Sequence, residues 1–277
     1  MGIKTIMVHL ELEKPRGSLL ALTGELALKL SAAEVIGIAG CQPVELIYGD
    51  TYVAGEVMAA DRKQIEHDLK VVEERFTSAL TGKVDRLEWR SNITYGPLAD
   101  YIAREARAAD LLITGPEIGG SMFDHARRTR IADLVLEVGR PVLIVPDTCD
   151  KLDLGHVLIG WKDSPECRRA TLAAVPFFKL AGRVSVLAIT SQASQKEIEG
   201  EVEDVVGWLS RHGVTATGEV AQKKGEDAAC FHKLVKEKSP GLVVAGAYAH
   251  SRLREWALGG VTGDVLLRPD RPVLLFH

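Results

Sequence analysis

The amino-acid sequence predicts an α/β protein made of two tandem copies of an open, doubly wound domain, each with a five-stranded parallel sheet. The first observation behind this prediction is internal similarity. RPVLIV at 140–145 recurs as RPVLLF at 271–276, and DLLITGP at 110–116 recurs as GLVVAGA at 241–247; 271 − 140 and 241 − 110 both equal 131. A period this long spans several secondary-structure elements, so it indicates duplication of a whole domain.

A shared helical face is the second observation. Apolar residues recur with the i, i+4, i+7, i+11 spacing that places them on one side of an α-helix. They are Ile65, Leu69, Val72 and Phe76 in the first copy, and Ile198, Val202, Val205 and Leu209 in the second. Third, runs rich in Val, Ile and Leu alternate with such helical patterns, which is typical of a parallel sheet covered by helices on both faces.

The expected elements alternate strictly in the first copy. Apolar runs predict the strands, and longer segments with a helical period predict the helices. In order, they are a strand at 5–12, a helix at 18–30, a strand at 34–40, a helix at 56–80, a strand at 87–94, a helix at 98–107, a strand at 110–115, a helix at 131–138 and a strand at 141–146. The strands expected in the second copy are 156–161, 183–189, 214–221, 242–247 and 272–276.

Residues 147–154, DTCDKLDL, are a short polar linker, so we expect domains at 1–147 and 155–277. The net charge of −4 gives no electrostatic reason to expect nucleic acid or an anionic membrane as a partner. No apolar run approaches the length of a membrane span, and the first residues do not resemble a signal peptide. The four cysteines form no zinc or disulfide pattern, which favours a cytoplasmic location.

A candidate phosphate site follows the strand that ends at Gly246. Ligands of open parallel sheets bind outside the carboxyl ends of the strands, where the strand order reverses. Gly259 and Gly260 precede the expected last helix, whose free N-terminal amides suit phosphate, and Val261 and Thr262 would add an amide and a hydroxyl. The alternative is that these glycines are ordinary turn residues, because neither a Walker lysine nor GxGxxG is present.

The spacing resembles the ATP-binding signature of universal stress proteins, which is Gly-x-x-Gly, nine residues, then Gly-Ser/Thr after the fourth strand. Gly246, Ala249, Gly259 and Gly260 occupy its four positions, with alanine replacing the second glycine and glycine replacing Ser/Thr. RPVLIV and RPVLLF are similar to the last strand of that family, so the whole chain resembles a tandem universal stress protein. The resemblance implies an adenine-nucleotide alpha-hydrolase-like fold, with the copies packed as a pseudo-dimer through these last strands.

The resemblance also implies contacts at the ends of the first two strands. In the family, an acidic residue after the first strand contacts the nucleoside, and backbone near the end of the second strand meets the adenine. Lys162 stands in the place of the acid with Asp163 beside it, and the second contact falls near Ala188. Either Lys162 reaches ribose or phosphate, or Asp163 takes the role of the acid. The alternative for this segment is a helix start, and the known capping preferences favour Ser164 as its cap.

Three polar residues follow the first glycine turn, namely His250, Ser251 and Arg252. Arg252 would neutralise phosphate charge, and the other two would donate hydrogen bonds to it. The alternative is that they are exposed loop residues without a role.

The first copy serves as an internal comparison. Gly115 aligns with the first glycine of the signature, but Arg128 and Thr129 stand where the second copy has its glycine pair. Glu11 keeps the acid of the family. A long side chain at Arg128 would block close approach of phosphate to the backbone, so we interpret the first copy as a degenerate nucleotide site.

The sequence therefore predicts a cytoplasmic stress-response protein that binds an adenine nucleotide in its C-terminal domain as a regulatory ligand. ATP is the first choice, ADP or AMP the alternatives, and Mg²⁺ is an optional companion. No catalytic motif is present, so we expect no enzyme activity beyond slow ATP hydrolysis. Unidentified proteins would be its partners, and a homodimer of the pseudo-dimer is a further option. The alternative function is a stress-response interaction module that binds no nucleotide.

Overall fold

The computed structural model describes residues 2–12, 17–43, 55–116, 129–223, 227–247 and 270–277 of the chain. They form two compact units. The N-terminal unit comprises 3–140 and 147–151, and the C-terminal unit is chiefly 141–146 and 152–277. Residues 141–146 end the first sequence copy but group with the C-terminal unit, because the strand they contain pairs with the last strand of that unit.

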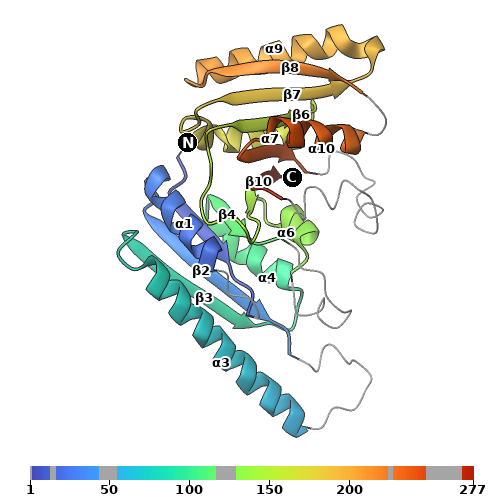
Figure 1. The fold of residues 1–277 in the computed structure, drawn as a ribbon. Coiled ribbons are helices and arrows are strands. Elements are labelled where there is room, and N and C mark those ends of the chain that lie inside the picture. Colours follow the sequence, from blue (N-terminus) through green and yellow to red (C-terminus); the bar gives the residue numbers. More distant parts are fainter. Residues whose placement is uncertain (1, 13–16, 44–54, 117–128, 224–226, 248–269) are drawn as a thin grey trace. The chain divides into compact units, whose positions relative to one another are not determined.

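The N-terminal unit has a parallel sheet with the strand order β3-β2-β1-β4 (Figure 1). The strand order reverses at β1, which lies between β2 and β4. Helix α3 packs against β2 and β3. The elements are β1 (Thr5–His9), α1 (Gly17–Leu30), β2 (Glu34–Cys41), α3 (Gly55–Leu80), β3 (Arg86–Ile93), α4 (Leu98–Glu105), a 3₁₀ turn (Ala106–Ala108), β4 (Leu111–Thr114) and α6 (Ile131–Glu137).

The C-terminal unit has the strand order β5-β10-β9-β6-β7-β8. Its order reverses at β6, which lies between β9 and β7. The elements are β5 (Val142–Ile144), β6 (Val157–Trp161), α7 (Pro165–Ala173), α8 (Val175–Phe178), β7 (Val184–Thr190), a 3₁₀ turn (Gln192–Ser194), α9 (Gln195–Arg211), β8 (Ala216–Gln222), α10 (Asp227–Lys238), β9 (Leu242–Gly246) and β10 (Val273–Phe276). All described pairings in this unit are parallel except β5 with β10, which is antiparallel.

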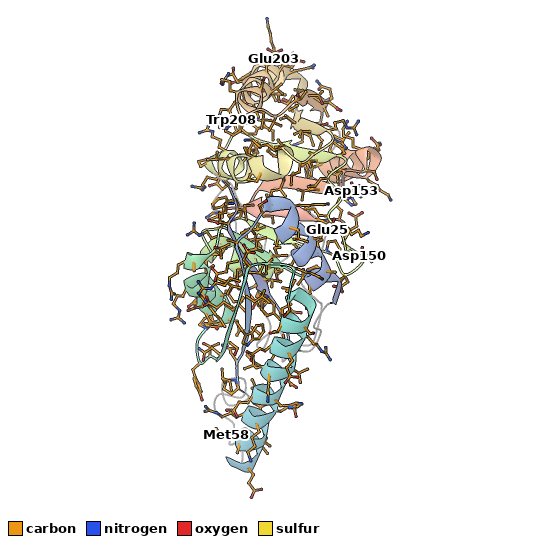
Figure 2. All side chains as sticks on the ribbon, turned by 90° about the vertical axis from the view of Figure 1, so that its left-hand side faces the viewer. Glu25, Met58, Asp150, Asp153, Glu203 and Trp208 are labelled. Atoms are coloured by element: carbon orange, nitrogen blue, oxygen red, sulfur yellow. The ribbon has the colours of Figure 1, made fainter. Side chains whose placement is uncertain are left out.

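The predicted fold class is confirmed, and the helical faces found in the sequence form the core. Ile65, Leu69, Val72 and Phe76 are all buried, as are Val202, Val205 and Leu209, while Ile198 is half-buried. The pairing of β5 with β10 is the one expected between the last strands of the two copies. The exposed side of α9 carries charged residues such as Glu203 (Figure 2). The ring of Trp208 lies against that of His212, with 4.3 Å between centroids and 45° between the planes. In the described part of the chain, no helix is both long and apolar enough to cross a membrane.

The strand registers show which positions of the two copies are equivalent. Ile6 pairs with Leu111 in the N-terminal unit, and Val157 pairs with Leu242 in the C-terminal unit. Counting from these pairs, Gly37 corresponds to Val186 and Trp89 to Gly218. In the N-terminal unit the ring of Trp89 lies over Gly37, where a Cβ would be 2.6 Å from it, whereas in the C-terminal unit Val202 lies over Gly218. The two sheets thus fill equivalent positions with different side chains.

A buried histidine, His156, lies directly before β6. The Nδ1 atom of His156 accepts a hydrogen bond from Arg183 Nη2 at 2.9 Å, and its Nε2 is 3.0 Å from Ser185 Oγ. A guanidinium can only donate, so Nδ1 carries no proton and the ring is neutral. Burial and the charge of Arg183 both lower the pKa of His156.

We expect His156→Gln to reduce the acid sensitivity of the fold. Because the pKa of the folded ring lies below that of the unfolded chain, the unfolded state binds the extra proton first. The contribution of the neutral ring is complete above the unfolded pKa of about 6.5 and is lost as the pH falls below it. Urea unfolding from about pH 8 to about pH 5 should therefore show a smaller fall in unfolding free energy for the variant than for the wild type. His212→Gln, at an exposed position, is the control, and equal pH dependences in all three proteins would contradict this account.

Candidate functional site

The carboxyl ends of β9, β6 and β7 lie side by side where the strand order reverses. Gly160 pairs with Ala245, and Trp161 pairs with Ala188. The structure therefore brings Lys162, Ala188 and Gly246, three of the predicted nucleotide-binding residues, to one edge of one sheet, with Asp163 next in the chain. The other predicted binding residues lie outside the described part of the chain; they are Ala249, His250, Ser251, Arg252, Gly259, Gly260, Val261 and Thr262.

Gly246 has a packing reason to be glycine. A Cβ at this position would be 2.4 Å from the backbone nitrogen of Cys167 and 2.8 Å from the carbonyl carbon of Glu166. These are backbone atoms of the first turn of α7, so they have little freedom to move away. Gly246 lets α7 approach the end of β9 closely, and this requirement exists whether or not a ligand binds.

The N-terminus of α7 is satisfied by its own residues. Ser164 is the N-cap, as predicted, and its Oγ accepts a hydrogen bond from the Cys167 amide at 3.2 Å, while Pro165 begins the helix. The carboxylate of Glu166 adds a negative charge to this turn, and its own backbone amide lowers the pKa of that carboxyl. A phosphate would have to compete with both groups, so this helix N-terminus is a poor anion site.

Asp163 forms a two-point ion pair with Arg168. The carboxylate oxygens lie 2.8 Å from Nε and 2.6 Å from Nη2 of the guanidinium. This hydrogen bonding lowers the pKa of Asp163, and both side chains are largely exposed. Asp163 is therefore anchored to α7 and partly neutralised, while the neighbouring Lys162 is exposed.

The structure adds Phe231 of α10, which the sequence analysis missed. A Cβ on Gly160 would be 2.7 Å from Cζ of Phe231, so the ring lies directly over the strand at this point. Strand β6 ends at Trp161, so Lys162 follows the strand directly, two residues after the glycine that Phe231 covers. Phe231 is half-buried and so remains partly accessible at this edge. The available signal was Gly160 itself, because glycine inside a buried strand often marks a close approach by another group.

Catalytic chemistry finds little support in the described residues of this site. Burial raises the pKa of the Cys167 thiol, which keeps it protonated, and its Sγ lies 3.4 Å from the carbonyl oxygen of Gly160. The Ser164 hydroxyl is engaged as the helix cap. Nowhere in the described ranges do three or more His, Cys, Asp or Glu side chains cluster as metal ligands would.

The corresponding edge of the N-terminal unit is filled differently. His9 and Thr114 occupy the positions of Gly160 and Ala245, and both are buried. The His9 Nδ1 and Thr114 Oγ1 atoms lie 3.0 Å apart, so a polar pair stands where the C-terminal unit has room for Phe231.

Glu11 is half-buried after β1, Gly115 directly follows β4, and Thr129 is buried just before α6. Arg128 lies outside the described residues.

Comparison with known proteins identifies the fold. No protein-family model matches the sequence, and a search of curated proteins gives no match. Among solved structures, a universal stress protein from Archaeoglobus fulgidus DSM 4304 is similar over 98% of this chain and 95% of its own, with 14% identity and a TM-score of 0.73. A provisionally assigned universal stress protein from Pseudomonas aeruginosa UCBPP-PA14 matches over 99% of this chain and 93% of its own, with 15% identity and a TM-score of 0.58.

A shorter match is a universal stress protein from Archaeoglobus fulgidus in complex with dAMP. It covers 46% of this chain and 99% of its own, with 18% identity and a TM-score of 0.36. The two matches that span nearly the whole chain show that the protein has the fold of a tandem universal stress protein.

We expect Gly246→Ala to destabilise the protein in the absence of any nucleotide. The added methyl group would overlap backbone atoms of α7, and overpacking of this kind costs at least about 2 kcal/mol when the obstruction is backbone. Urea unfolding of nucleotide-free protein measures the change. Gly200→Ala is the matched control, because nothing lies within 4 Å of its Cβ position on α9, and it should be neutral or stabilising by about 1 kcal/mol. An unchanged stability in Gly246→Ala would mean that this glycine does not serve packing.

Proposed function

We propose that this chain is a tandem universal stress protein that binds an adenine nucleotide, ATP in the first instance, at the carboxyl edge of β9, β6 and β7. The observation that carries the proposal is the convergence of Lys162, Ala188 and Gly246 at the point where the strand order of the C-terminal unit reverses. Open parallel sheets bind their ligands at this point. The proposed site lies within residues 155–277, and the N-terminal copy would act as its structural partner.

The described residues suggest how the nucleoside is held. The half-buried ring of Phe231 offers an apolar wall over Gly160, two residues before Lys162. Lys162 would bring a cation to the ribose or the first phosphate, since Asp163 is already paired with Arg168. The backbone at Ala188 would meet the base.

We assign phosphate binding to the residues that follow β9 in the chain, because the N-terminus of α7 is occupied by Ser164 and Glu166. Gly259, Gly260, Val261 and Thr262 would supply amide and hydroxyl donors, and Arg252, with His250 and Ser251, would supply charge and hydrogen bonds. Ala249 replaces a glycine of the family signature there. Mg²⁺ would then bind chiefly through the phosphates rather than through a protein cluster.

The bound nucleotide acts as a regulatory ligand with little or no turnover. The Cys167 thiol is held protonated and Asp163 is ion-paired, so neither is placed to activate water or attack phosphorus. Occupancy would bias the protein toward a conformation that cytoplasmic protein partners recognise in a stress response.

Two observations favour the second candidate, an interaction module that binds no nucleotide. The packing of Gly246 against Cys167 explains the first glycine of the signature without any ligand. The ion pair of Asp163 likewise has a structural explanation.

Calorimetric titration with ATP and magnesium tests the proposal. The wild type should show saturable binding, and Gly259→Arg with Gly260→Thr, which writes the N-terminal copy's residues into the C-terminal copy, should lose at least about tenfold in affinity because side chains then block the backbone amides. The reciprocal double variant Arg128→Gly with Thr129→Gly is the control and should keep the wild-type affinity at the C-terminal site. If the wild type neither binds ATP nor retains a nucleotide on purification, the interaction module is the better account.

A further inference from the structure

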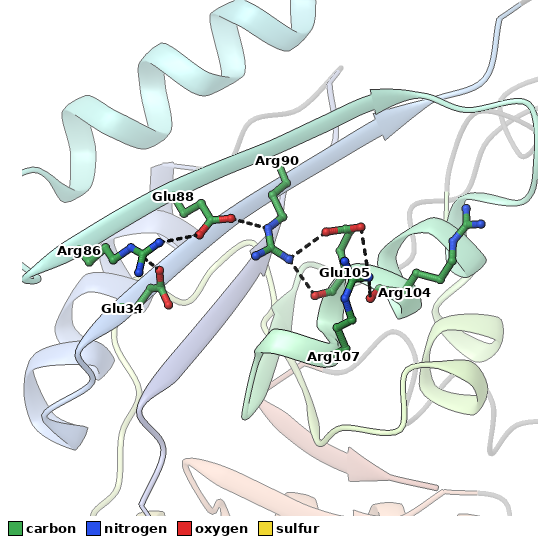
Figure 3. Close-up of polar contacts among 7 residues, drawn as sticks. All are labelled: Glu34, Arg86, Glu88, Arg90, Arg104, Glu105 and Arg107. Atoms are coloured by element: carbon green, nitrogen blue, oxygen red, sulfur yellow. Dashed lines mark hydrogen bonds and ion pairs between the residues drawn. The ribbon is translucent and has the colours of Figure 1, made fainter.

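In each unit, one ion pair joins a strand to a helix, and we call this ion pair a tie. The strand supplies the cation of the tie in one unit and the anion in the other. In the N-terminal unit, Arg90 of β3 reaches Glu105, the last residue of α4, with Nη1 2.9 Å from the carboxylate and 3.1 Å from the carbonyl oxygen (Figure 3). In the C-terminal unit, Glu219 of β8 binds the ammonium group of Lys238, the last residue of α10. Each helix is the one that leads from the third strand of its copy to the fourth.

The strand residues of the two ties occupy equivalent positions in the two sheets. Ile6 and Val157 correspond, and they pair through Val35 and Val184 to Leu87 and Ala216 on the third strands. Three residues further along these strands stand Arg90 and Glu219. The same strand position therefore carries a cation in one copy and an anion in the other.

Each tie is complete within its own unit. The C-terminus of a helix carries partial negative charge and favours a cation. Helix α10 provides its own cations, Lys236 and Lys238, so its strand supplies the anion. Helix α4 also has a cation in its last turn, Arg104, but it ends in the carboxylate of Glu105, and Arg90 of the strand contacts both this carboxylate and the carbonyl oxygen of Glu105.

A duplicated fold carries the risk that equivalent helices exchange places, either within one chain or between two chains. With α4 against β8, Glu219 would face Glu105 and the carbonyl end of the helix. With α10 against β3, Arg90 would face Lys238. Both exchanges would bring like charges together. Arg90, Glu105 and Lys238 are 20 to 25% exposed in the native pairs and Glu219 is 47% exposed, so water would screen the repulsion in part, and more strongly at Glu219.

Neighbouring charges would offset little of the repulsion between like charges in the exchanged pairs. Glu88 already lies between Arg86 and Arg90, with oxygens 3.4 Å and 2.7 Å from their guanidinium groups, and these neighbours lower its pKa (Figure 3). Arg107 lies 3.5 Å from Glu105, but it is 70% exposed and contributes little.

We propose that the opposite polarity of these two ion pairs keeps α4 on its own sheet and α10 on its own sheet, and so prevents exchange of the two helices between the copies. A steric difference acts in the same direction. Phe231 of α10 fits over Gly160, whereas His9 fills the equivalent position of the N-terminal sheet. The proposal concerns folding and assembly, and it does not depend on nucleotide binding.

Refolding of the full-length chain tests the proposal in a background without the steric difference. The background variant is Phe231→Ala. The matched-polarity variant adds Glu219→Arg with Lys238→Glu, which gives both ties the polarity of the N-terminal unit. The neutral control adds Glu219→Gln with Lys238→Gln, which removes the tie without creating a matching one. Each protein is unfolded in urea and refolded by dilution, and light scattering after size-exclusion chromatography compares it with a sample that was never unfolded.

The expected result is that matched polarity raises the fraction of exchanged dimers and misfolded species by about fivefold over the neutral control, as removal of about 1 kcal/mol of discrimination would. Equal recovery of the native species in the matched and neutral variants would overturn the proposal. If the matched variant yields no native protein, Arg90→Glu with Glu105→Lys provides the same comparison from the other copy, with Arg90→Gln and Glu105→Gln as its neutral control.

Discussion

The pairing of β6 with both β7 and β9 is the constraint on which the C-terminal unit depends. It sets the point where the strand order reverses, and it brings the ends of three parallel strands to one edge. Two glycines at this edge lack a Cβ, and each allows a neighbouring group to approach the sheet closely. The two groups approach from opposite faces of the sheet. Gly246 admits the first turn of α7, and Gly160 admits Phe231 of α10. The sheet is thus closely covered on both faces at the edge where we propose that the nucleotide binds.

The two copies share one backbone fold but pack different side chains at equivalent positions. Where the C-terminal unit places Phe231 over Gly160, the N-terminal unit places the hydrogen-bonded pair of His9 and Thr114. In the N-terminal sheet Trp89 lies over Gly37. The equivalent positions in the C-terminal sheet are occupied by Gly218 and Val186, respectively. Protein interiors are closely packed, so an exchange of large and small residues at one position must be matched at its neighbour. The polar pair in the N-terminal unit occupies the position that Phe231 covers in the C-terminal unit, so the two copies present different side chains at the carboxyl edge of the sheet.

Local features were predictable from the sequence because they depend on neighbouring residues. The Ser164 cap and the buried face of α3 follow from capping preference and from helical spacing. The roles of Gly246 and Phe231 could not be predicted, because each depends on a contact with a residue far away in the sequence, Cys167 and Gly160 respectively. The ion pair joins Asp163, which precedes the cap of α7, to Arg168 only five residues later, yet the choice between a cap, a nucleoside ligand and an ion pair required the geometry. The predicted phosphate-binding residues from Ala249 to Thr262 remain a prediction from the family signature.

The central claim is that the C-terminal unit holds an adenine nucleotide at the edge formed by β9, β6 and β7. Photolabelling with an azido-adenine analogue of ATP, followed by peptide mapping, tests this claim most directly because it reports both binding and place. The account predicts saturable labelling, suppressed by unlabelled ATP, on peptides that contain Lys162, Ala188 or Phe231. Labelling confined to the N-terminal unit, or labelling that excess ATP does not suppress, would contradict it.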